Sequence, residues 1–272
     1  MEEADRWLIE AEPRLRALSE PGVLPLGVHS ASGSTRLEVP MTQYIGAILD
    51  PRGAHGLGTL TLEHALTTLL GHGATVANAR VYVEVPLGRA CQACRTSRVL
   101  DLAIVGADFA VAIEHKIRSG ETNRRCPEQA GVIRRQGEDT LGLFGDWARA
   151  RRGELGLGEG SLDLAFVYLT PRGASPSERP GDLSPWRAVS HRDLADAVAP
   201  ALARGLRPGA YHSLAAFILD LAEAEFDGWM PVFARAAEDL RVGRRLPAAN
   251  VLQLYRLFTR NPSLMWLLET VR

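Results

Sequence analysis

The sequence predicts an α/β core followed by a bundle of helices. Two observations support this fold class. The first is the order of the periodic patterns, in which a helix, three strands, a helix and a further strand follow one another. The second is the helical spacing of nearly every segment after His191. The chain has 272 residues, which is enough for one large domain or for a domain with a helical annex.

The N-terminal part of the chain predicts helices. Apolar residues recur at helical spacing over 4–19, 41–49 and 60–70. A Gly/Ser-rich stretch after Pro21 and the segment 50–58 (DPRGAHGLG) interrupt this spacing. Because glycine, proline and serine favour turns and loops, we expect connecting loops at both places.

Four runs of residues predict strands. Residues 80–85 (RVYVEV) alternate between apolar and polar, whereas 98–105 (RVLDLAIV) and 109–117 (FAVAIEHKI) are mostly apolar. A Gly-Ala-Asp turn joins the second run to the third. The run 162–170 (LDLAFVYLT) is typical of a buried strand, and we expect a helix before it, from about Pro127 into the 140s.

The C-terminal part of the chain, from His191 to Arg272, predicts a series of helices. Prolines mark the expected breaks between them: Pro208, Pro231, Pro247 and Pro262. The large apolar residues of these helices have the spacing of an ordinary core. The alternative is an exposed apolar face, which would serve as a homodimer or partner interface.

Composition excludes several classes of protein. The net charge of −1 provides no general basic field for nucleic acid, and no apolar run approaches the length of a membrane span. The acidic, amphipathic N-terminal segment is unlike a signal peptide. Cys91 and Cys94 have the C-x-x-C spacing of a zinc knuckle, and Cys126 is a third thiol, but no fourth ligand is signalled. Reduced thiols in a cytoplasmic protein are therefore favoured over a structural zinc site.

Lys116 is the only lysine in the chain. The remaining 30 of the 31 basic residues are arginines. An ammonium group is a compact point charge that can approach a bound water or a developing oxyanion, whereas a guanidinium is bulky and always protonated. A lysine retained among arginines therefore indicates a position where a point charge is needed.

The residues around Lys116 form a pattern with chemical meaning. On a strand, Glu114 and Lys116 share one face and His115 faces the other way. If the preceding hairpin turns on two residues, Asp101 lies directly across from Glu114. Two carboxylates on directly opposite residues repel each other unless a cation lies between them. Hard oxygen ligands of this kind suit Mg²⁺.

The order of strand, aspartate, hairpin, strand and E-x-K resembles the PD-(D/E)xK nuclease superfamily. An acid-bearing helix before the strands and a glutamine-bearing helix after them complete this resemblance. The segments 48–58 (ILDPRGAHGLG), 167–177 (VYLTPRGASPS) and 186–198 (WRAVSHRDLADAV) resemble a bacterial branch of predicted nucleases. The resemblance covers about residues 38–200 and implies a restriction-endonuclease-like core, with a mixed sheet flanked by helices.

The resemblance also implies a division of the chain and a set of metal ligands. The nuclease core (38–200) would follow an N-terminal helix and linker (1–37) and precede a C-terminal helical region (201–272). Asp101 and Glu114 would bind Mg²⁺ or Mn²⁺.

The same resemblance implies roles for three further residues. Glu63, on the helix before the strands, would help to hold the metal ion. Lys116 would position or activate the attacking water, or stabilise charge on the phosphate. Gln129 would help to orient the site.

Several polar residues near these positions are further candidates. Glu84 lies on the polar face of the first strand, either as an additional acid of the site or as a solvated strand residue. His55 could bind phosphate or shape its own loop. The arginines around the glutamine-bearing helix suit contacts with a phosphate backbone: Arg124, Arg125, Arg134 and Arg135.

Two functional hypotheses remain at this stage. The first is a metal-dependent nuclease that acts on DNA, in a setting such as restriction, repair or anti-phage defence. The second is a nucleic-acid-binding or scaffold module of the same fold with little catalysis. The near-neutral charge supports the second, whereas the intact D…E-x-K set opposes it. Uptake of Mg²⁺ or Mn²⁺ that depends on Asp101 would separate them.

Overall fold

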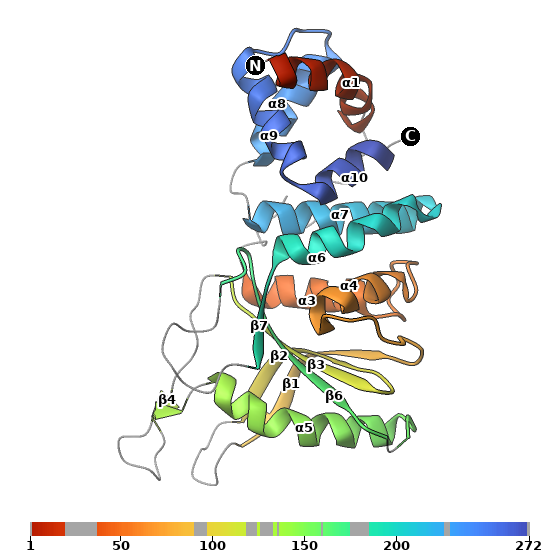
Figure 1. The fold of residues 1–272 in the computed structure, drawn as a ribbon, viewed down its shortest axis with the longest axis vertical. Coiled ribbons are helices and arrows are strands. Elements are labelled where there is room, and N and C mark those ends of the chain that lie inside the picture. The colour runs from red at the N-terminus through yellow and green to blue at the C-terminus, as the bar shows by residue number, and fades with distance from the viewer. Residues whose placement is uncertain are drawn as a thin grey trace.

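The computed structural model confirms the α/β fold and describes most of the chain. The described residues are 2–19, 37–89, 97–117, 124–125, 133–134, 136–158, 160–174, 185–225 and 229–270. Within them, a mixed five-stranded sheet lies between layers of helices (Figure 1). None of the helices in this part of the chain is long and apolar enough to cross a membrane.

The sheet has the strand order β1-β2-β3-β6-β7. The first three strands pair antiparallel, and β3, β6 and β7 pair parallel. Every residue of the central strand β3 is buried, which fits a strand with helices on both of its faces. The strand bounds are β1 (Arg80–Gly88), β2 (Arg98–Val105), β3 (Phe109–His115), β6 (Asp163–Thr170) and β7 (Trp186–Ser190).

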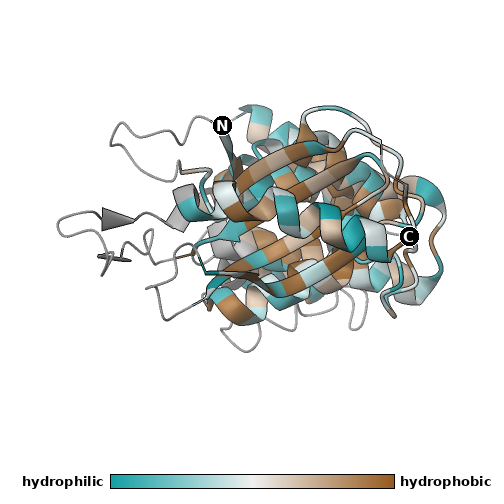
Figure 2. Ribbon diagram, turned by 90° about the horizontal axis from the view of Figure 1, so that it is seen from below, coloured by the Kyte–Doolittle hydropathy of each residue, from teal (hydrophilic) through white to brown (hydrophobic). Residues whose placement is uncertain are grey.

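One face of the sheet is covered by α5 (Gln136–Glu154). Phe144 and Ala148 of this helix belong to one apolar cluster with side chains of all five strands. Figure 2, which views the molecule from this side, shows helices that carry both hydrophobic and hydrophilic residues, as helices with one buried side do.

The predicted start of this helix, near Pro127, is wrong. The structure instead pairs two short strands, β4 (Arg124–Arg125) and β5 (Ile133–Arg134), and α5 begins only at Gln136. A glycine and two β-branched residues, in the sequence Gly-Val-Ile, precede this point, and they disfavour a helix. Pro127 itself lies outside the described residues.

The opposite face of the sheet is covered by α3 (Glu38–Leu49) and α4 (Leu60–Leu70) (Figure 1). Gly46 allows α3 to approach the sheet closely, because a Cβ atom there would lie only 2.6 Å from the Val83 side chain. The helix begins at Glu38, earlier than the predicted start at residue 41, and this extension brings Glu38 into its first turn.

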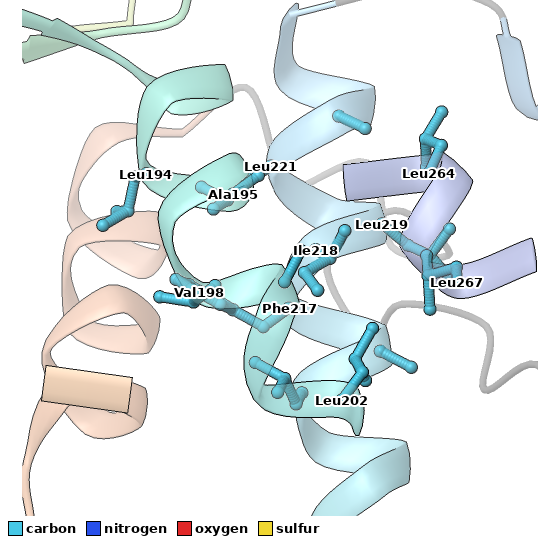
Figure 3. Packing of buried hydrophobic residues seen from close by; sticks show 14 of the residues in the cluster. Leu194, Ala195, Val198, Leu202, Phe217, Ile218, Leu219, Leu221, Leu264 and Leu267 are labelled. Carbon is cyan, nitrogen blue, oxygen red and sulfur yellow. The ribbon is translucent and has the colours of Figure 1, made fainter. Parts of the chain in front are cut away.

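A second layer of helices packs on α3 and α4. It consists of α6 (His191–Val198), the 3₁₀ helix η2 (Ala199–Arg204) and α7 (Pro208–Glu225). Figure 3 shows apolar side chains of α6, η2, α7 and α10 meeting in one interior. Ser190 caps α6 by accepting the Asp193 N–H, and the Asp193 carboxylate accepts the Ser190 N–H in return.

The outermost helices come from both ends of the described chain. The helix α1 (Glu2–Ser19) packs against α8 (Trp229–Arg241), α9 (Ala248–Thr259) and α10 (Pro262–Thr270). Trp7 of α1 lies with its ring centroid 5.9 Å from those of both Tyr255 and Phe258. The predicted N-terminal helix therefore shares one helical layer with the C-terminal region (Figure 1).

The predicted breaks at prolines coincide with the starts of helices. Pro208 and Pro262 are the first residues of α7 and α10, and Pro247 is the N-cap of α9. Pro231 lies within the first turn of α8. Proline is tolerated at these positions because the first N–H groups of a helix have no intrahelical acceptor.

Candidate active site

The β2–β3 hairpin has the register that the sequence predicts. The Gly106 N–H donates to the Phe109 carbonyl at 2.9 Å, which closes the two-residue turn. The backbone pairs run from Val105–Ala110 to Leu102–Ile113. The next position in this register sets Asp101 opposite Glu114, at the end of the paired region.

The single lysine lies among three carboxylates at this end of the hairpin. The Nζ atom of Lys116 is 3.1 Å from Oδ2 of Asp101 on β2. It is also 3.8 Å from Oε2 of Glu114 on β3, and 3.8 Å from Oε2 of Glu38 on α3. The two strands of the hairpin and the distant helix α3 therefore contribute one acidic side chain each to a single cation.

Each of these carboxylates has a second contact that fixes its orientation. Asp101 Oδ2 accepts the backbone N–H of His115 at 2.8 Å. Glu38 Oε1 accepts the backbone N–H of Ile117 at 3.2 Å. These hydrogen bonds continue the order of the sheet beyond the point where backbone pairing between β2 and β3 ends.

The third carboxylate, Glu114, is oriented from the α5 side of the sheet. Thr140 of α5 donates its hydroxyl to Glu114 Oε1 at 3.2 Å. The preceding residue, Asp139, forms a buried ion pair with Arg98 at the start of β2, with 2.6 Å between Arg98 Nε and Asp139 Oδ2. This ion pair ties the first turn of α5 to the strand that carries Asp101.

The local electrostatics keep Lys116 charged. Burial disfavours the ammonium, but Asp101, Glu114 and Glu38 together outweigh this effect and raise the pKa of Lys116 above its ordinary value. Among the described residues, three carboxylates against this one ammonium leave an excess of negative charge if all are ionised. The site can therefore accommodate additional positive charge, and its lysine is suited to act as a cation.

The edge strand β1 bends where it passes Asp101. Glu84 has φ = 51°, which is unusual for a residue other than glycine. It lies opposite Asp101, between the pairs Val83–Leu102 and Val85–Leu100. Val83 packs on the α3 side of the sheet and Val85 on the α5 side, so the strand changes the face of its apolar residues at Glu84. Local strain of this kind is common near functional sites.

His115 faces away from Glu114 and Lys116, as the alternation of the strand predicts. Its Nδ1 atom lies 2.7 Å from Thr42 Oγ1, and its Nε2 atom lies 2.8 Å from Nε2 of His191. Burial lowers the pKa of His115 to about 3, and the Lys116 charge adds to this shift. Burial also lowers the pKa of His191 well below its ordinary value, so both rings are neutral at pH 7.

Two predicted candidates have other partners in the structure. Glu63 is exposed at the start of α4, where its carboxylate accepts the Thr59 hydroxyl at 2.6 Å. His55 bonds both ring nitrogens within its own loop, because Nδ1 accepts the Leu57 N–H and Nε2 lies 2.9 Å from the Asp50 carbonyl. These contacts match the interpretation of His55 as a residue that shapes its loop.

The remaining candidates are only partly described. In the described part of the chain, the Glu84 side chain is exposed and forms no hydrogen bond or ion pair. Arg124 and Arg134 are direct partners in the β4–β5 ladder, where Arg125 pairs with Ile133. The other predicted residues lie outside the described part of the chain: Arg135, Gln129, Cys91, Cys94 and Cys126.

Glu38 is the residue of this cluster that the sequence interpretation missed. The predicted helix began at Met41, so Glu38 was placed on no helix and was not a candidate for the site. A usable signal was present, because an acidic residue is favoured in the first turn of a helix and the apolar spacing of this helix tolerates an earlier start.

The donor atoms of the cluster suit a hard divalent cation. Mg²⁺ is commonly held by one or two carboxylates together with waters and substrate phosphate, and Asp101 and Glu114 supply such carboxylates. Among the described residues, no group of three or more His, Cys, Asp and Glu side chains is arranged to hold a metal ion as it stands. A bound cation would therefore share the site with Lys116 or displace its ammonium.

Comparisons of the chain with protein-family models, with curated proteins and with solved structures gave no significant match.

Proposed function

We propose that the protein is a metal-dependent nuclease with a restriction-endonuclease-like core, and that its expected substrate is DNA. The observation that carries the proposal is the environment of the only lysine, which lies within 3.8 Å of carboxylates from β2, β3 and α3. An ammonium next to hard oxygen ligands is a combination suited to phosphodiester hydrolysis.

The residues of the cluster would divide the work as follows. Asp101 and Glu114 would hold Mg²⁺ or Mn²⁺, and Glu38 takes the place that the sequence resemblance gave to Glu63. The bound cation would supply Lewis acidity and neutralise phosphate charge. Lys116 is held as a cation by its neighbours and would stabilise the negative charge that develops on the phosphate.

The reaction is the hydrolysis of a phosphodiester bond. The oxygen of a water molecule loses a proton and bonds to phosphorus. The bond from phosphorus to one sugar oxygen breaks, and this oxygen takes up a proton to become a hydroxyl. Thr140 and the backbone N–H groups of His115 and Ile117 would keep the three carboxylates in place during this exchange. Arg124, Arg125 and Arg134 on the β4–β5 ladder would contact the phosphate backbone away from the cleaved bond.

A cleavage assay with purified protein tests the proposal. Plasmid DNA would be incubated with Mg²⁺ or Mn²⁺ and the wild type, Asp101→Asn, Lys116→Arg or Glu38→Gln. Cleavage that needs the metal and falls in all three variants is the expected result. Asp146→Asn, on the exposed side of α5, is the control and should cleave like the wild type.

The assay also separates two candidates for the third acid. If Glu38 has that role, Glu38→Gln should lower cleavage and Glu63→Gln should leave it nearly unchanged. Full cleavage by Asp101→Asn or by Lys116→Arg would refute the proposed site.

A second function is favoured by one observation. The Lys116 ammonium already neutralises part of the acidic cluster, so the cluster could be an internal ion network of a nucleic-acid-binding or scaffold module. Titration with Mn²⁺ decides between the two functions. A nuclease should bind Mn²⁺ in the wild type and lose this binding in Asp101→Asn, whereas a module without catalysis should bind none.

A further inference from the structure

Three buried polar side chains form a hydrogen-bonded chain between the sheet and the helices. Thr42 lies on α3, His115 on β3, and His191 is the first residue of α6. Nδ1 of His115 is 2.7 Å from Thr42 Oγ1, and its Nε2 is 2.8 Å from Nε2 of His191. The proposed hydrolysis uses none of the three side chains.

The hydrogen bonds of this chain fix its direction. The Thr42 hydroxyl donates its single proton to the Glu38 carbonyl at 2.8 Å, so its oxygen must accept a proton from His115 Nδ1. The Nε2 atom of His115 then carries no proton and accepts the N–H of His191 Nε2.

Hydrogen bonds that run in the opposite direction, from Thr42 to His115 to His191, would be less favourable. This direction would leave a proton on His191 Nδ1, which is buried and has no hydrogen-bond partner in the described structure. A buried donor without an acceptor is costly, whereas an unused acceptor is tolerated more readily. The structure therefore assigns a proton to Nδ1 of His115 and to Nε2 of His191.

The chain ends at the residue that supplies the third carboxylate. Thr42 binds the backbone carbonyl of Glu38, while the Glu38 carboxylate accepts the Ile117 N–H at 3.2 Å. Glu38 is thus tied to the residues on either side of Lys116, through its backbone to His115 and through its side chain to Ile117. His191 extends the support to α6, whose first turn is fixed by its capping box.

We propose that Thr42, His115 and His191 are positioning residues, which hold the first turn of α3 so that the Glu38 carboxylate reaches Lys116. The inference depends on the proposed function only for the catalytic use of Glu38. The contact between Glu38 and the end of β3 can be measured without any catalysis.

Two neighbouring backbone amides provide a selective measurement. The Ile117 N–H is bound by Glu38, whereas the Lys116 N–H donates to the Leu169 carbonyl of β6 at 2.9 Å. A loss of Glu38 positioning should expose the Ile117 amide alone, whereas a general loss of stability should expose both. Hydrogen exchange of the two amides, measured by NMR in metal-free protein, distinguishes these cases.

Thr42→Val tests the chain because it removes the hydroxyl at nearly constant volume. We expect exchange at Ile117 to become about tenfold faster, as for the loss of one hydrogen bond, while exchange at Lys116 changes by less than about twofold. Thr42→Ser keeps the hydroxyl and should restore protection of Ile117. The matched control is Thr61→Val, since Thr61 is also buried and donates to an α3 carbonyl, that of Ile48, at 2.6 Å.

The proposal is overturned if Thr42→Val leaves the Ile117 amide protected, or if Thr61→Val exposes it equally. Nitrogen-15 spectra of the wild-type imidazoles give a test that does not depend on the folding of a variant. They should show the Nδ1–H form for His115 and the Nε2–H form for His191, and the opposite pair of tautomers would also overturn the proposal.

Failure of the proposed nuclease function can be distinguished from failure of this positioning inference. If the wild type cleaves DNA, Thr42→Val should lower kcat more than it changes KM, because Glu38 would be displaced and the DNA-binding surface would not. If no protein cleaves DNA, the nuclease proposal fails, and the exchange rates and tautomers still decide whether the chain positions Glu38.

Discussion

Replacement of Lys116 by methionine should destabilise the protein strongly. Methionine keeps most of the volume of the side chain but removes the charge. The side chain of Glu114 is only 3% exposed, so its carboxylate would lose the Lys116 ammonium while it remains buried. The side chains of Asp101 and Glu38 are each 26% exposed and could be hydrated instead.

The magnitude follows from these exposures. Removal of one partner from a buried ion pair costs about 3–5 kcal/mol, and this value applies to Glu114. The two partly exposed carboxylates add at most about 1 kcal/mol each, and hydration or protonation of the cluster offsets part of the total. We therefore expect the free energy of unfolding to fall by about 3 kcal/mol at pH 7 for Lys116→Met.

Urea unfolding at equilibrium, in the presence of a chelator, measures this loss. Lys116→Arg is the matched control, because it keeps the charge and should lose distinctly less stability. A loss below about 1 kcal/mol for Lys116→Met would refute the view that the ammonium neutralises a buried carboxylate. If the cluster binds divalent cations, Mn²⁺ should restore part of the lost stability in the methionine variant.

Three further predictions concern the surroundings of the site. Burial lowers the pKa of His115 and of His191 in the folded state, so the unfolded chain binds more protons than the folded protein below about pH 6.5. The free energy of unfolding should therefore decrease as the pH is lowered from 7. One such histidine contributes a loss of about 2 kcal/mol at pH 5, and denaturant unfolding between pH 7 and 5 should show a shallower slope in His191→Phe. Glu84→Val should cost roughly 1–2 kcal/mol, since a β-branched residue does not tolerate φ = 51°, while Glu84→Gly should stay close to the wild type in thermal unfolding. Asp139→Ala leaves the Arg98 guanidinium buried without its carboxylate, and calorimetry should show a loss of about 3–5 kcal/mol; a loss near zero would contradict the anchoring role of this pair.

The sequence was sufficient to predict the β2–β3 hairpin, because turn length and strand alternation determine its geometry locally. The two-residue turn at Ala107 and Asp108 sets the register, and the alternation of the strand then determines which side chains share a face. The positions of Asp101, Glu114 and Lys116 follow from these two rules. The β1–β2 pairing is antiparallel, as neighbouring strands in a meander usually are, but the bend at Glu84 has no local signal in a sequence that alternates.

The contributions of the helices could not be derived from local rules. Glu38 reaches Lys116 only because α3 packs closely on the sheet at Gly46, and that contact joins positions distant in the chain. Thr140 reaches Glu114 because α5 begins at Gln136 and is tied to β2 by a buried ion pair. The resemblance to the nuclease superfamily implied Glu63 instead, which also lies on a helix before the strands but faces solvent.

The segment from Glu114 to Lys116 links the two sides of the sheet through consecutive residues. Glu114 meets α5 on one face, where Thr140 donates to it, and His115 meets α3 and α6 on the other. Lys116 then follows at the end of the strand, where its ammonium is shared by carboxylates from both hairpin strands and from α3. A displacement of α3 or of α5 would therefore alter the same cluster from opposite sides. This geometry predicts that variants of Thr42 and of Thr140 should affect the Lys116 ammonium together and not independently. A double-mutant cycle that measures the pKa of this ammonium should show a coupling energy between them.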